Sequence, residues 1–256
     1  MKLDYFDLTG KVAVVSGGAT GIGYGISEGL AEAGVTLVIC SRRLNVCEDS
    51  AHAIHEKTGA KVLSMRCDIT SKDDINALIK DVVSKLGGID ILVNCAGVGG
   101  SEKAVVDMDE SDWDSVMNIN LKGAYTFSQA VIGPMRKRGK GGRIINVSSI
   151  LSIIASANMS AYCVAKSGLT QLTKVMALEL VRDNILVNAI LPGYVETPMN
   201  TEFFSSKAGE MVIKKNIPMR RIGQIQEMKG LAILLASEAS SLMTGSALVV
   251  DGGNSL

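Results

Sequence analysis

The stretch Lys11–Cys40, KVAVVSGGATGIGYGISEGLAEAGVTLVIC, decides the fold of this chain. A β-branched run over residues 11–16 predicts a short buried strand, and a glycine-rich turn over 17–23 follows it. Apolar residues at helical spacing continue to Gly34, and residues 35–40 form a second apolar run. Strand, turn, helix and strand in this order make a βαβ unit, which requires parallel strand pairing and a right-handed crossover.

The same alternation continues along the chain. Further strands are predicted over 61–66, 89–94, 143–147, 185–191 and 247–251, and helices over 71–86, 112–137, a segment ending near 182, and 228–236. This alternation predicts an α/β fold: a doubly wound, Rossmann-like parallel sheet of about seven strands with helices on both faces. Because no linker, repeat or low-complexity tract interrupts it, residues 1–256 are predicted to form a single dinucleotide-binding and catalytic domain.

Composition narrows the possible partners and the compartment. The chain has 26 Lys+Arg and 26 Asp+Glu, so no overall field attracts nucleic acid or an anionic membrane. Its five cysteines are scattered without a CxxC pair, which indicates free thiols in a reducing compartment. With neither a signal peptide nor an apolar run of about 18 residues, the expected location is cytoplasmic.

The two histidines, His52 and His55, do not indicate a site. They lie three residues apart on a polar helical segment, which favours exposure to solvent over metal binding. A serine hydrolase would need one of them together with a GxSxG turn, which the sequence lacks. We therefore predict no metal site and no hydrolase.

The glycine-rich turn predicts a nucleotide site. Gly17, Gly21 and Gly23 stand between a strand and a helix, where backbone N–H groups can approach a pyrophosphate at the helix N-terminus. The spacing differs from the common GxGxxG pattern, and the GK[ST] signature of a P-loop is missing.

The end of the second strand predicts which dinucleotide binds. An acidic residue there would bind the ribose 2′-hydroxyl of NAD and repel a 2′-phosphate. This chain instead has Ser41, Arg42 and Arg43, whose hydroxyl and guanidinium groups suit a phosphate. The cofactor is therefore predicted to be NADP(H), with NAD(H) as the less favoured alternative.

Tyr162 and Lys166 are the first candidates for chemistry. Their spacing of four residues places them on one face of a helix, where an ammonium would lower the tyrosine pKa from about 10. Such a tyrosine could exchange a proton near neutral pH. Taken alone, however, the pair favours an exposed Tyr/Lys pair on an amphipathic helix over a catalytic pair.

One segment departs from the alternation. Residues 197–218 contain apolar side chains but no strand, and they follow a strand at the edge where such sheets bind ligands. We predict a mobile substrate lid here; a packed pair of surface helices is the alternative.

Taken together, these motifs resemble the short-chain dehydrogenase/reductase family, from Leu8 to Gly253. The matching elements are the glycine loop, Asn94-Cys95-Ala96-Gly97, Asn120, Ser149, Tyr162 with Lys166, and Pro192-Gly193. Cys95 departs from the family's usual Asn-Asn-Ala-Gly, and Thr20 stands where NADP(H)-preferring members often have a basic residue. Ser148 and Ser149 are neighbours, and the family's interval before the tyrosine selects Ser149.

The resemblance implies a role for each matching residue. Tyr162 would be the general acid/base, Lys166 would lower its pKa and bind the nicotinamide ribose, Ser149 would polarise the carbonyl, and Asn120 would hold a water that links Lys166 to solvent. The implied cofactor contacts are Gly17, Thr20, Gly21, Ile22, Gly23, Ser41, Arg42, Arg43, Asp68, Ile69, Asn94, Ala96, Gly97, Tyr162, Lys166, Ile190, Pro192, Gly193, Val195 and Thr197. Asp68 in particular would contact the adenine, and Asn94 would brace the central strand.

The implied activity is hydride transfer between NADP(H) and a ketone or secondary alcohol. The expected pocket wall is mostly apolar and does not favour a strongly anionic small substrate; its residues are Val98, Gly99, Ile150, Leu151, Ile154, Asn158, Met159, Tyr194, Met199 and Phe203. The resemblance extends to sugar and polyol reductases and equally to 3-oxoacyl-carrier-protein reductases. The rival from another class is a dinucleotide-binding regulator without catalysis. Members of the family are usually homotetramers assembled through the long helices and the last strand.

Overall fold

The chain folds around one seven-stranded sheet. The computed structural model describes residues 4–198 and 200–256. Every strand pair is parallel and the order is β3-β2-β1-β4-β5-β6-β7. The strands are β1 (Val12–Ser16), β2 (Thr36–Ser41), β3 (Val62–Arg66), β4 (Ile91–Asn94), β5 (Gly142–Val147), β6 (Ile185–Pro192) and β7 (Ala247–Val250). The prediction of a doubly wound Rossmann-like sheet is confirmed.

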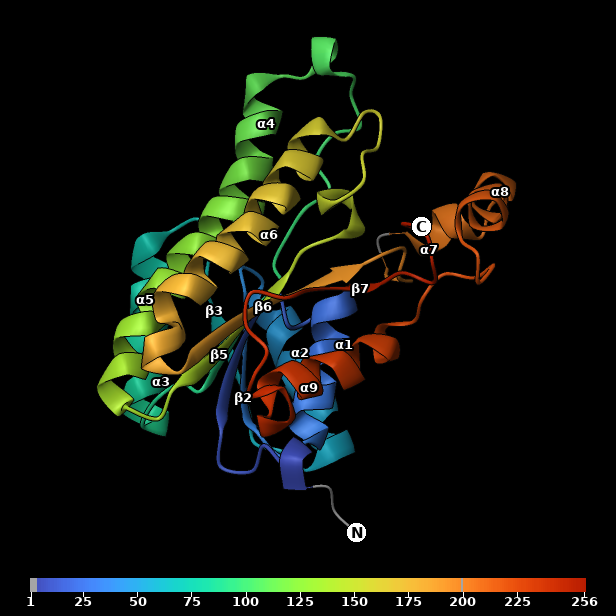
Figure 1. The fold of residues 1–256 in the computed structure, drawn as a ribbon. Helices are drawn as coiled ribbons and strands as arrows, with labels where there is room; N and C mark the ends of the chain where they lie inside the picture. The colour runs from blue at the N-terminus through green and yellow to red at the C-terminus, as the bar shows by residue number, and fades with distance from the viewer. Residues whose placement is uncertain (1–3, 199) are drawn as a thin grey trace.

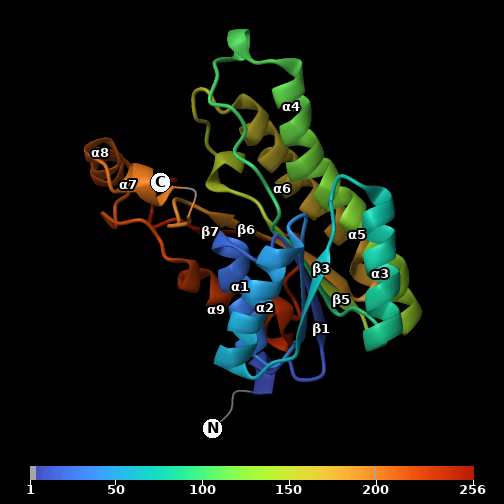
Figure 2. The ribbon, with the colours of Figure 1, turned by 180° about the vertical axis from the view of Figure 1, so that it is seen from behind.

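The sheet lies between two layers of helices (Figures 1 and 2). The helices are α1 (Gly21–Glu32), α2 (Leu44–Thr58), α3 (Lys72–Leu86), α4 (Glu110–Met117), α5 (Ala124–Arg138), α6 (Ser160–Leu180), α7 (Thr201–Phe204), α8 (Lys207–Asn216) and α9 (Lys229–Ala236). One apolar core joins the sheet to α1, α2 and α9, and a second joins it to α3, α5 and α6. Within the described ranges, no helix has the length and hydropathy to cross a membrane.

The strand order reverses beside β1. Val14 of β1 pairs with Val38 of β2 on one side and with Leu92 of β4 on the other. The chain builds outward from β1 in both directions, so the crossovers on the two sides diverge. In such sheets, ligands bind at the C-terminal ends of the strands at this reversal. The glycine-rich turn after β1 is therefore at the expected place for a nucleotide.

The helix expected over 112–137 is interrupted. It consists of α4, a π-helical turn over Asn118–Gly123, and α5. Inside the turn, the Asn120 amide bonds both backbone groups of Val98, with two distances of 2.8 Å. A π turn holds one residue more than an α-helical turn and often marks a functional site. The apolar periodicity of the sequence does not reveal this interruption.

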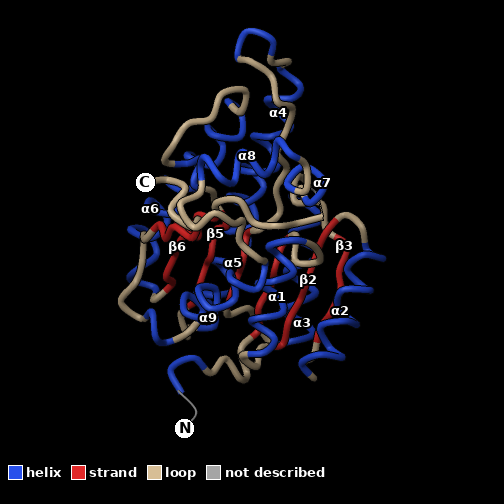
Figure 3. Tube along the Cα trace, turned by 90° about the vertical axis from the view of Figure 1, so that its right-hand side faces the viewer, coloured by secondary structure: helices blue, strands red, loops and turns tan. Residues whose placement is uncertain are grey.

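The segment predicted as a lid carries two helices. Figure 3 shows α7 and α8 beyond the upper edge of the strands. Phe204 of α7 packs edge-on against Tyr194, with ring centroids 5.2 Å apart, and against Phe203 at 5.1 Å. Met199, expected to line the pocket, lies outside the described residues. The segment thus has the helices that the alternative interpretation expects, and its motion stays a prediction.

Candidate active site

The glycine-rich turn is shaped by close backbone approaches. Gly17 has φ +67°, and a Cβ added there would lie 2.8 Å from the Cα of Ala96. A Cβ added to Gly23 would collide with the Gly17 carbonyl oxygen. No side chain fits at either position, so the turn stays open to a ligand that approaches the backbone closely.

The N-terminus of α1 is available to an anion. Thr20 is the N-cap residue but its side chain makes no capping bond, and the first turn of α1 holds no acidic side chain. The first N–H groups of a helix need an acceptor and carry its positive dipole end. The turn and the helix therefore fit the pyrophosphate of a dinucleotide. Thr197 reaches the same place, because its methyl carbon would lie 3.1 Å from a Cβ on Gly21.

The end of β2 is the place where the sequence predicts that a phosphate binds. Ser41 Oγ accepts a bond from the Arg43 N–H at 3.2 Å, which turns the chain so that Arg42 and Arg43 are exposed. Asp68 lies after the neighbouring β3 and its carboxylate accepts from Thr70. The hydrogen bond from the Thr70 N–H lowers the Asp68 pKa, and the Arg42 guanidinium lowers it further. Arg42 and Asp68 therefore face the same corner.

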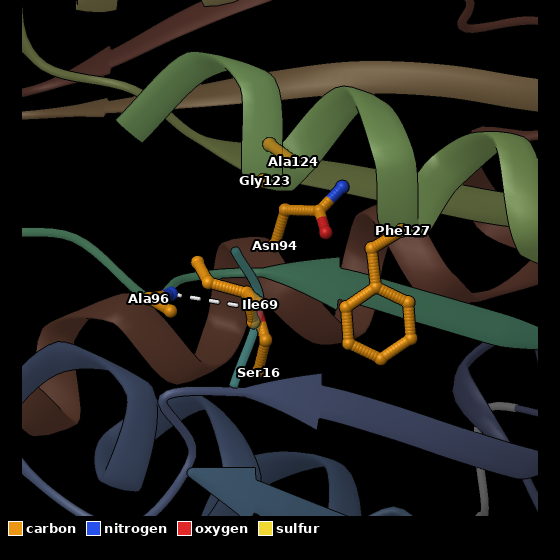
Figure 4. Close-up of a pocket in the computed structure, with 7 residues that line it drawn as sticks. All are labelled: Ser16, Ile69, Asn94, Ala96, Gly123, Ala124 and Phe127. Carbon is orange, nitrogen blue, oxygen red and sulfur yellow. Dashed lines mark hydrogen bonds between the residues drawn. The ribbon is translucent and has the colours of Figure 1, made fainter. Parts of the chain in front are cut away.

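Asn94 lies beneath the reversal point (Figure 4). Its amide nitrogen donates to Ser128 Oγ and to Asn146 Oδ1, both at 2.9 Å, which ties β4 to α5 and β5. A small pocket beside it is lined by Ser16, Ile69, Asn94, Ala96, Gly123, Ala124 and Phe127. The structure thus gathers three of the predicted cofactor contacts, Ile69, Asn94 and Ala96, around one point.

Ser149, Tyr162 and Lys166 meet where β5 ends against α6. Ser149 follows β5 in an extended conformation with φ −167°, and its Oγ accepts from the Leu151 N–H at 3.1 Å. The Lys166 Nζ lies 5.6 Å from the centroid of the Tyr162 ring and donates to the Val147 carbonyl at 2.8 Å. The expectation that the tyrosine and lysine share one helix face is correct.

The expected pKa of Tyr162 is wrong for this structure. Burial raises the pKa of Tyr162, and a hydrogen bond from Ser149 only partly opposes that effect. Burial also lowers the pKa of Lys166 to about 8. The ammonium lies over the ring and bonds the Val147 carbonyl, and desolvation of the phenolate is the largest effect on the Tyr162 pKa.

Asn120 and Gly97 complete the group. A Cβ on Gly97 would lie 3.0 Å from Asn120 Oδ1 and 3.6 Å from Lys166 Nζ, so the asparagine and the lysine converge at this glycine. Asn120 is buried, and both ends of its amide are bonded to Val98. Gly97 itself is exposed, which leaves an open side next to Lys166.

The last predicted contacts lie at the C-terminal end of β6 and just after it. The Gly193 N–H donates to the Val250 carbonyl at 3.0 Å, which joins the end of β6 to the end of β7. Pro192, Val195 and Ile190 are buried at the same edge of the sheet. This position is consistent with a contribution through backbone groups.

Sequence reasoning missed a buried polar row behind the site. Ser148 and Thr170 are 3% and 6% exposed and bond each other at 2.8 Å. Two signals were present: polar residues at 146 and 148, at the end of a buried strand and just after it, and Lys166, Thr170 and Thr173 at a spacing that places them on one helix face.

Comparison with known proteins gives matches over nearly the whole chain. Residues 17–255 match a family model described as enoyl-(acyl carrier protein) reductase. The chain is 39% identical to 2-dehydro-3-deoxy-D-gluconate 5-dehydrogenase of Escherichia coli K12, over 99% of this chain and 98% of that protein. It is 38% identical to the 3-oxoacyl-[acyl-carrier-protein] reductase FabG of Thermotoga maritima, over 96% and 98%.

Solved structures agree with these matches. A short-chain type dehydrogenase/reductase from Mycobacterium marinum superposes with a TM-score of 0.93 at 36% identity, with 98% of each chain covered. A gluconate 5-dehydrogenase from Burkholderia cenocepacia J2315, in complex with NADP and tartrate, has a TM-score of 0.93 at 35% identity, with 99% and 98% covered. Fold and relatives together define a nicotinamide-dinucleotide oxidoreductase acting on CH–OH groups. The chain belongs to the short-chain dehydrogenase/reductase family.

Proposed function

We propose that this protein is an NADP(H)-dependent oxidoreductase that interconverts a ketone and a secondary alcohol, with Tyr162 as the acid/base. The observation that carries the proposal is the meeting of Ser149, Tyr162 and Lys166 beside a glycine turn that fits a pyrophosphate. Bound NADP(H) would supply or accept the hydride. Asn120, converging with Lys166 at Gly97, completes the proposed catalytic set.

The proposed roles follow from position and chemistry. Tyr162 donates its phenolic proton to the carbonyl oxygen as charge develops there, and takes it back in the oxidative direction. Ser149 donates a hydrogen bond to the same oxygen, which stabilises the charge that forms in the transition state. Lys166 supplies the nearby cation. In this role its ammonium leaves the Val147 carbonyl and bonds a coenzyme hydroxyl instead. Its pKa of about 8 leaves it mostly protonated at neutral pH.

We propose a sugar, a polyol or another small carbonyl compound as the substrate. The E. coli and B. cenocepacia relatives are named for sugar acids. A strongly anionic substrate is not favoured, because neither of two nearby lysines is free to bind it. Lys166 is buried, and Lys103 is already paired with Asp109 and Asp112. A 3-oxoacyl thioester is the alternative, supported by the T. maritima relative. Residues 197–218 are proposed as the lid over this substrate, and a cytoplasmic location remains a prediction from the cysteine pattern.

The deciding experiment is oxidation of NADPH and NADH with a panel of ketones. The panel holds ketoses, 2-keto sugar acids, diketones, ketosteroids and 3-oxoacyl thioesters. Turnover of ketoses with NADPH supports the proposal, and turnover only of thioesters supports the alternative. Turnover only of 2-keto sugar acids would show that the site accepts an anionic substrate, against the argument from Lys166 and Lys103. Tight NADPH binding without turnover of any ketone would instead identify a dinucleotide-binding regulator.

The coenzyme preference tests the corner at the end of β2. Changing Arg42 and Arg43 together to serine removes two cations from the place proposed for the 2′-phosphate. We expect the KM for NADPH to rise about ten- to a hundredfold, because each charge-assisted bond contributes roughly 1.5–3 kcal/mol before solvent screening of these exposed side chains. The KM for NADH should change little.

Arg182→Ser, an exposed arginine beyond the end of α6, is the matched control and should leave both values unchanged. If wild-type protein uses NADH as efficiently as NADPH, or if the double variant keeps its NADPH KM, the NADP(H) assignment is wrong.

A homotetramer is proposed from exposed apolar side chains on α6. Val164, Val175 and Leu178 are 45%, 41% and 81% exposed, and their spacing places them on one helix face. Such a stripe needs a cover, and a second copy supplies the same stripe by twofold symmetry. Leu178→Asp should reduce the mass measured by light scattering to that of a smaller assembly. Leu44→Asp, on α2 at the opposite face of the sheet, should leave it unchanged; a monomeric wild-type protein would refute the proposal.

A further inference from the structure

A row of buried polar bonds joins the end of β5 to one face of α6. The last two residues of β5 and the residue after it bond three helix residues: Asn146 to Thr173 (2.8 Å), Val147 to Lys166 (2.8 Å), and Ser148 to Lys166 and Thr170 (2.9 and 2.8 Å). The helix partners at 166, 170 and 173 are spaced four and three residues apart, so they share one face. All of these residues are buried. Buried polar pairs that are fully bonded fix a unique arrangement of the elements that carry them.

Two of these bonds hold Lys166 at both of its ends. The Val147 carbonyl accepts from the Lys166 ammonium, and the hydroxyl of the next residue, Ser148, donates to the Lys166 backbone carbonyl. A lysine side chain has four rotatable bonds and does not fix the position of its ammonium by itself. The region that the ammonium can reach therefore depends on where the lysine backbone is held. The strand end therefore determines the position of the helix turn that carries this lysine.

The Thr170 hydroxyl is the donor in its hydrogen bond to Ser148. A hydroxyl has a single proton to donate. Since Ser148 uses its proton on the Lys166 carbonyl, the bond between Ser148 and Thr170 requires the Thr170 hydroxyl as donor. The chain of donors runs from Thr170 to Ser148 to Lys166. Removal of the Thr170 hydroxyl leaves Ser148 Oγ without a donor and free to rotate away.

We propose that Ser148 and Thr170 are positioning residues that fix the Lys166 backbone while its ammonium exchanges the Val147 carbonyl for the coenzyme. The assignment rests on the proposed function, in which Lys166 serves the reaction. Ser148 thus has a different task from its neighbour Ser149: Ser148 faces α6 and holds the lysine, and Ser149 faces the substrate.

The test compares Ser148→Ala and Thr170→Val with Thr173→Val. All three variants remove one buried hydroxyl between β5 and α6, but Thr173 lies two turns from Lys166 and bonds Asn146 and the Leu169 carbonyl instead. We expect Ser148→Ala and Thr170→Val to lower kcat about ten- to a hundredfold, the usual effect of misplacing a reacting group. Thr173→Val should lose similar thermal stability and keep kcat. Thr170→Ser, which keeps the hydroxyl, should restore kcat.

A second readout does not depend on turnover. NADPH affinity, measured by fluorescence, should fall as pH rises through about 8, where the Lys166 ammonium loses its proton. A loosened lysine gains contact with water, so this fall should move to higher pH in Ser148→Ala and Thr170→Val but not in Thr173→Val. The titratable groups facing Lys166 are Tyr162, whose pKa is raised, and Cys95, whose pKa is raised to about 11. Neither titrates near pH 8.

The outcomes separate this proposal from the proposed function. A wild-type protein that turns over no ketone refutes the proposed function, whereas the pH dependence of NADPH affinity still tests the positioning role. Equal kcat and equal pH dependence in the Ser148, Thr170 and Thr173 variants would overturn the positioning role. If Ser148→Ala fails to fold, the pair Thr170→Val and Thr170→Ser gives the same comparison.

Discussion

Tyr162→Phe should lower kcat for ketone reduction by about a hundred- to ten-thousandfold, the usual contribution of a positioned acid. The change removes one oxygen atom and keeps the ring that packs beside Ala161 and Ala165. In the proposed mechanism Tyr162 transfers its proton to the carbonyl oxygen, whereas Ser149 only donates a hydrogen bond to it. Ser149 should therefore not replace the missing phenol. The measurement is the steady-state rate with saturating NADPH and the best ketone of the panel.

Coenzyme affinity separates this effect from a folding defect. The dissociation constant for NADPH should stay within about threefold, since the phenol adds at most one neutral hydrogen bond to binding. Tyr125→Phe is the matched control, because Tyr125 is 45% exposed on α5 and its hydroxyl accepts a hydrogen bond from the exposed Gln129 side chain. A Tyr162→Phe enzyme with near-wild-type kcat would show that another group supplies the proton.

The pH dependence of the reaction should follow the direction in which the Tyr162 pKa is shifted. Burial raises the pKa of Tyr162 in this structure, so the tyrosine enters the reductive direction protonated at neutral pH, as an acid must. In the oxidative direction it must first lose that proton, and the positive nicotinamide ring of the oxidised coenzyme would favour the phenolate. A raised Tyr162 pKa therefore suits reduction near neutral pH better than the lowered pKa that the sequence predicted.

The fold was predictable because local and long-range signals agree. Short apolar strands such as Val12–Ser16 alternate with helical segments throughout, and a parallel sheet between two layers of helices is the arrangement that buries the central strands on both faces. The boundaries hold to within two residues at β1, β3 and α3. Ser71 is the N-cap residue of α3, with its Oγ accepting from the Asp74 N–H at 3.2 Å.

The failures occur where tertiary contacts override the local pattern. The break around Asn120 arises from two bonds to Val98, a residue 22 positions earlier in the chain, and no local propensity encodes such a pairing. The raised pKa of Tyr162 similarly depends on how deeply the ring is buried, which a spacing of four residues does not reveal. The positions of Ser149, Tyr162 and Lys166 could be predicted, but their electrostatics could not.

Lys166→Met should abolish most turnover and stabilise the folded protein at pH 7. Lys166 is 5% exposed and no carboxylate pairs with it in the described structure, so its charge is desolvated with only the Val147 carbonyl as partner. A pKa lowered from 10.5 to about 8 corresponds to roughly 3 kcal/mol of cost to the folded state below pH 8. The Lys166→Met variant leaves the Val147 carbonyl without this hydrogen bond, which destabilises it by about 1–2 kcal/mol and offsets part of the gain. Coenzyme-free Lys166→Met should therefore gain about 1–2 kcal/mol in free energy of unfolding.

The sign of this effect with pH distinguishes it from ordinary packing. The folded pKa of Lys166 lies below its unfolded value, so the unfolded chain binds more protons between pH 8 and 10.5 and wild-type stability recovers as pH rises through that window. The advantage of Lys166→Met should be complete below pH 8 and lost by about pH 10.5, as measured by urea unfolding across the range. Lys174→Met, on the exposed side of the same helix, should show no such dependence. A Lys166→Met variant that is less stable than wild type at pH 7 would mean that the ammonium binds more strongly in the fold than its burial implies. The enzyme would then keep this lysine without the cost in stability that a buried catalytic cation requires.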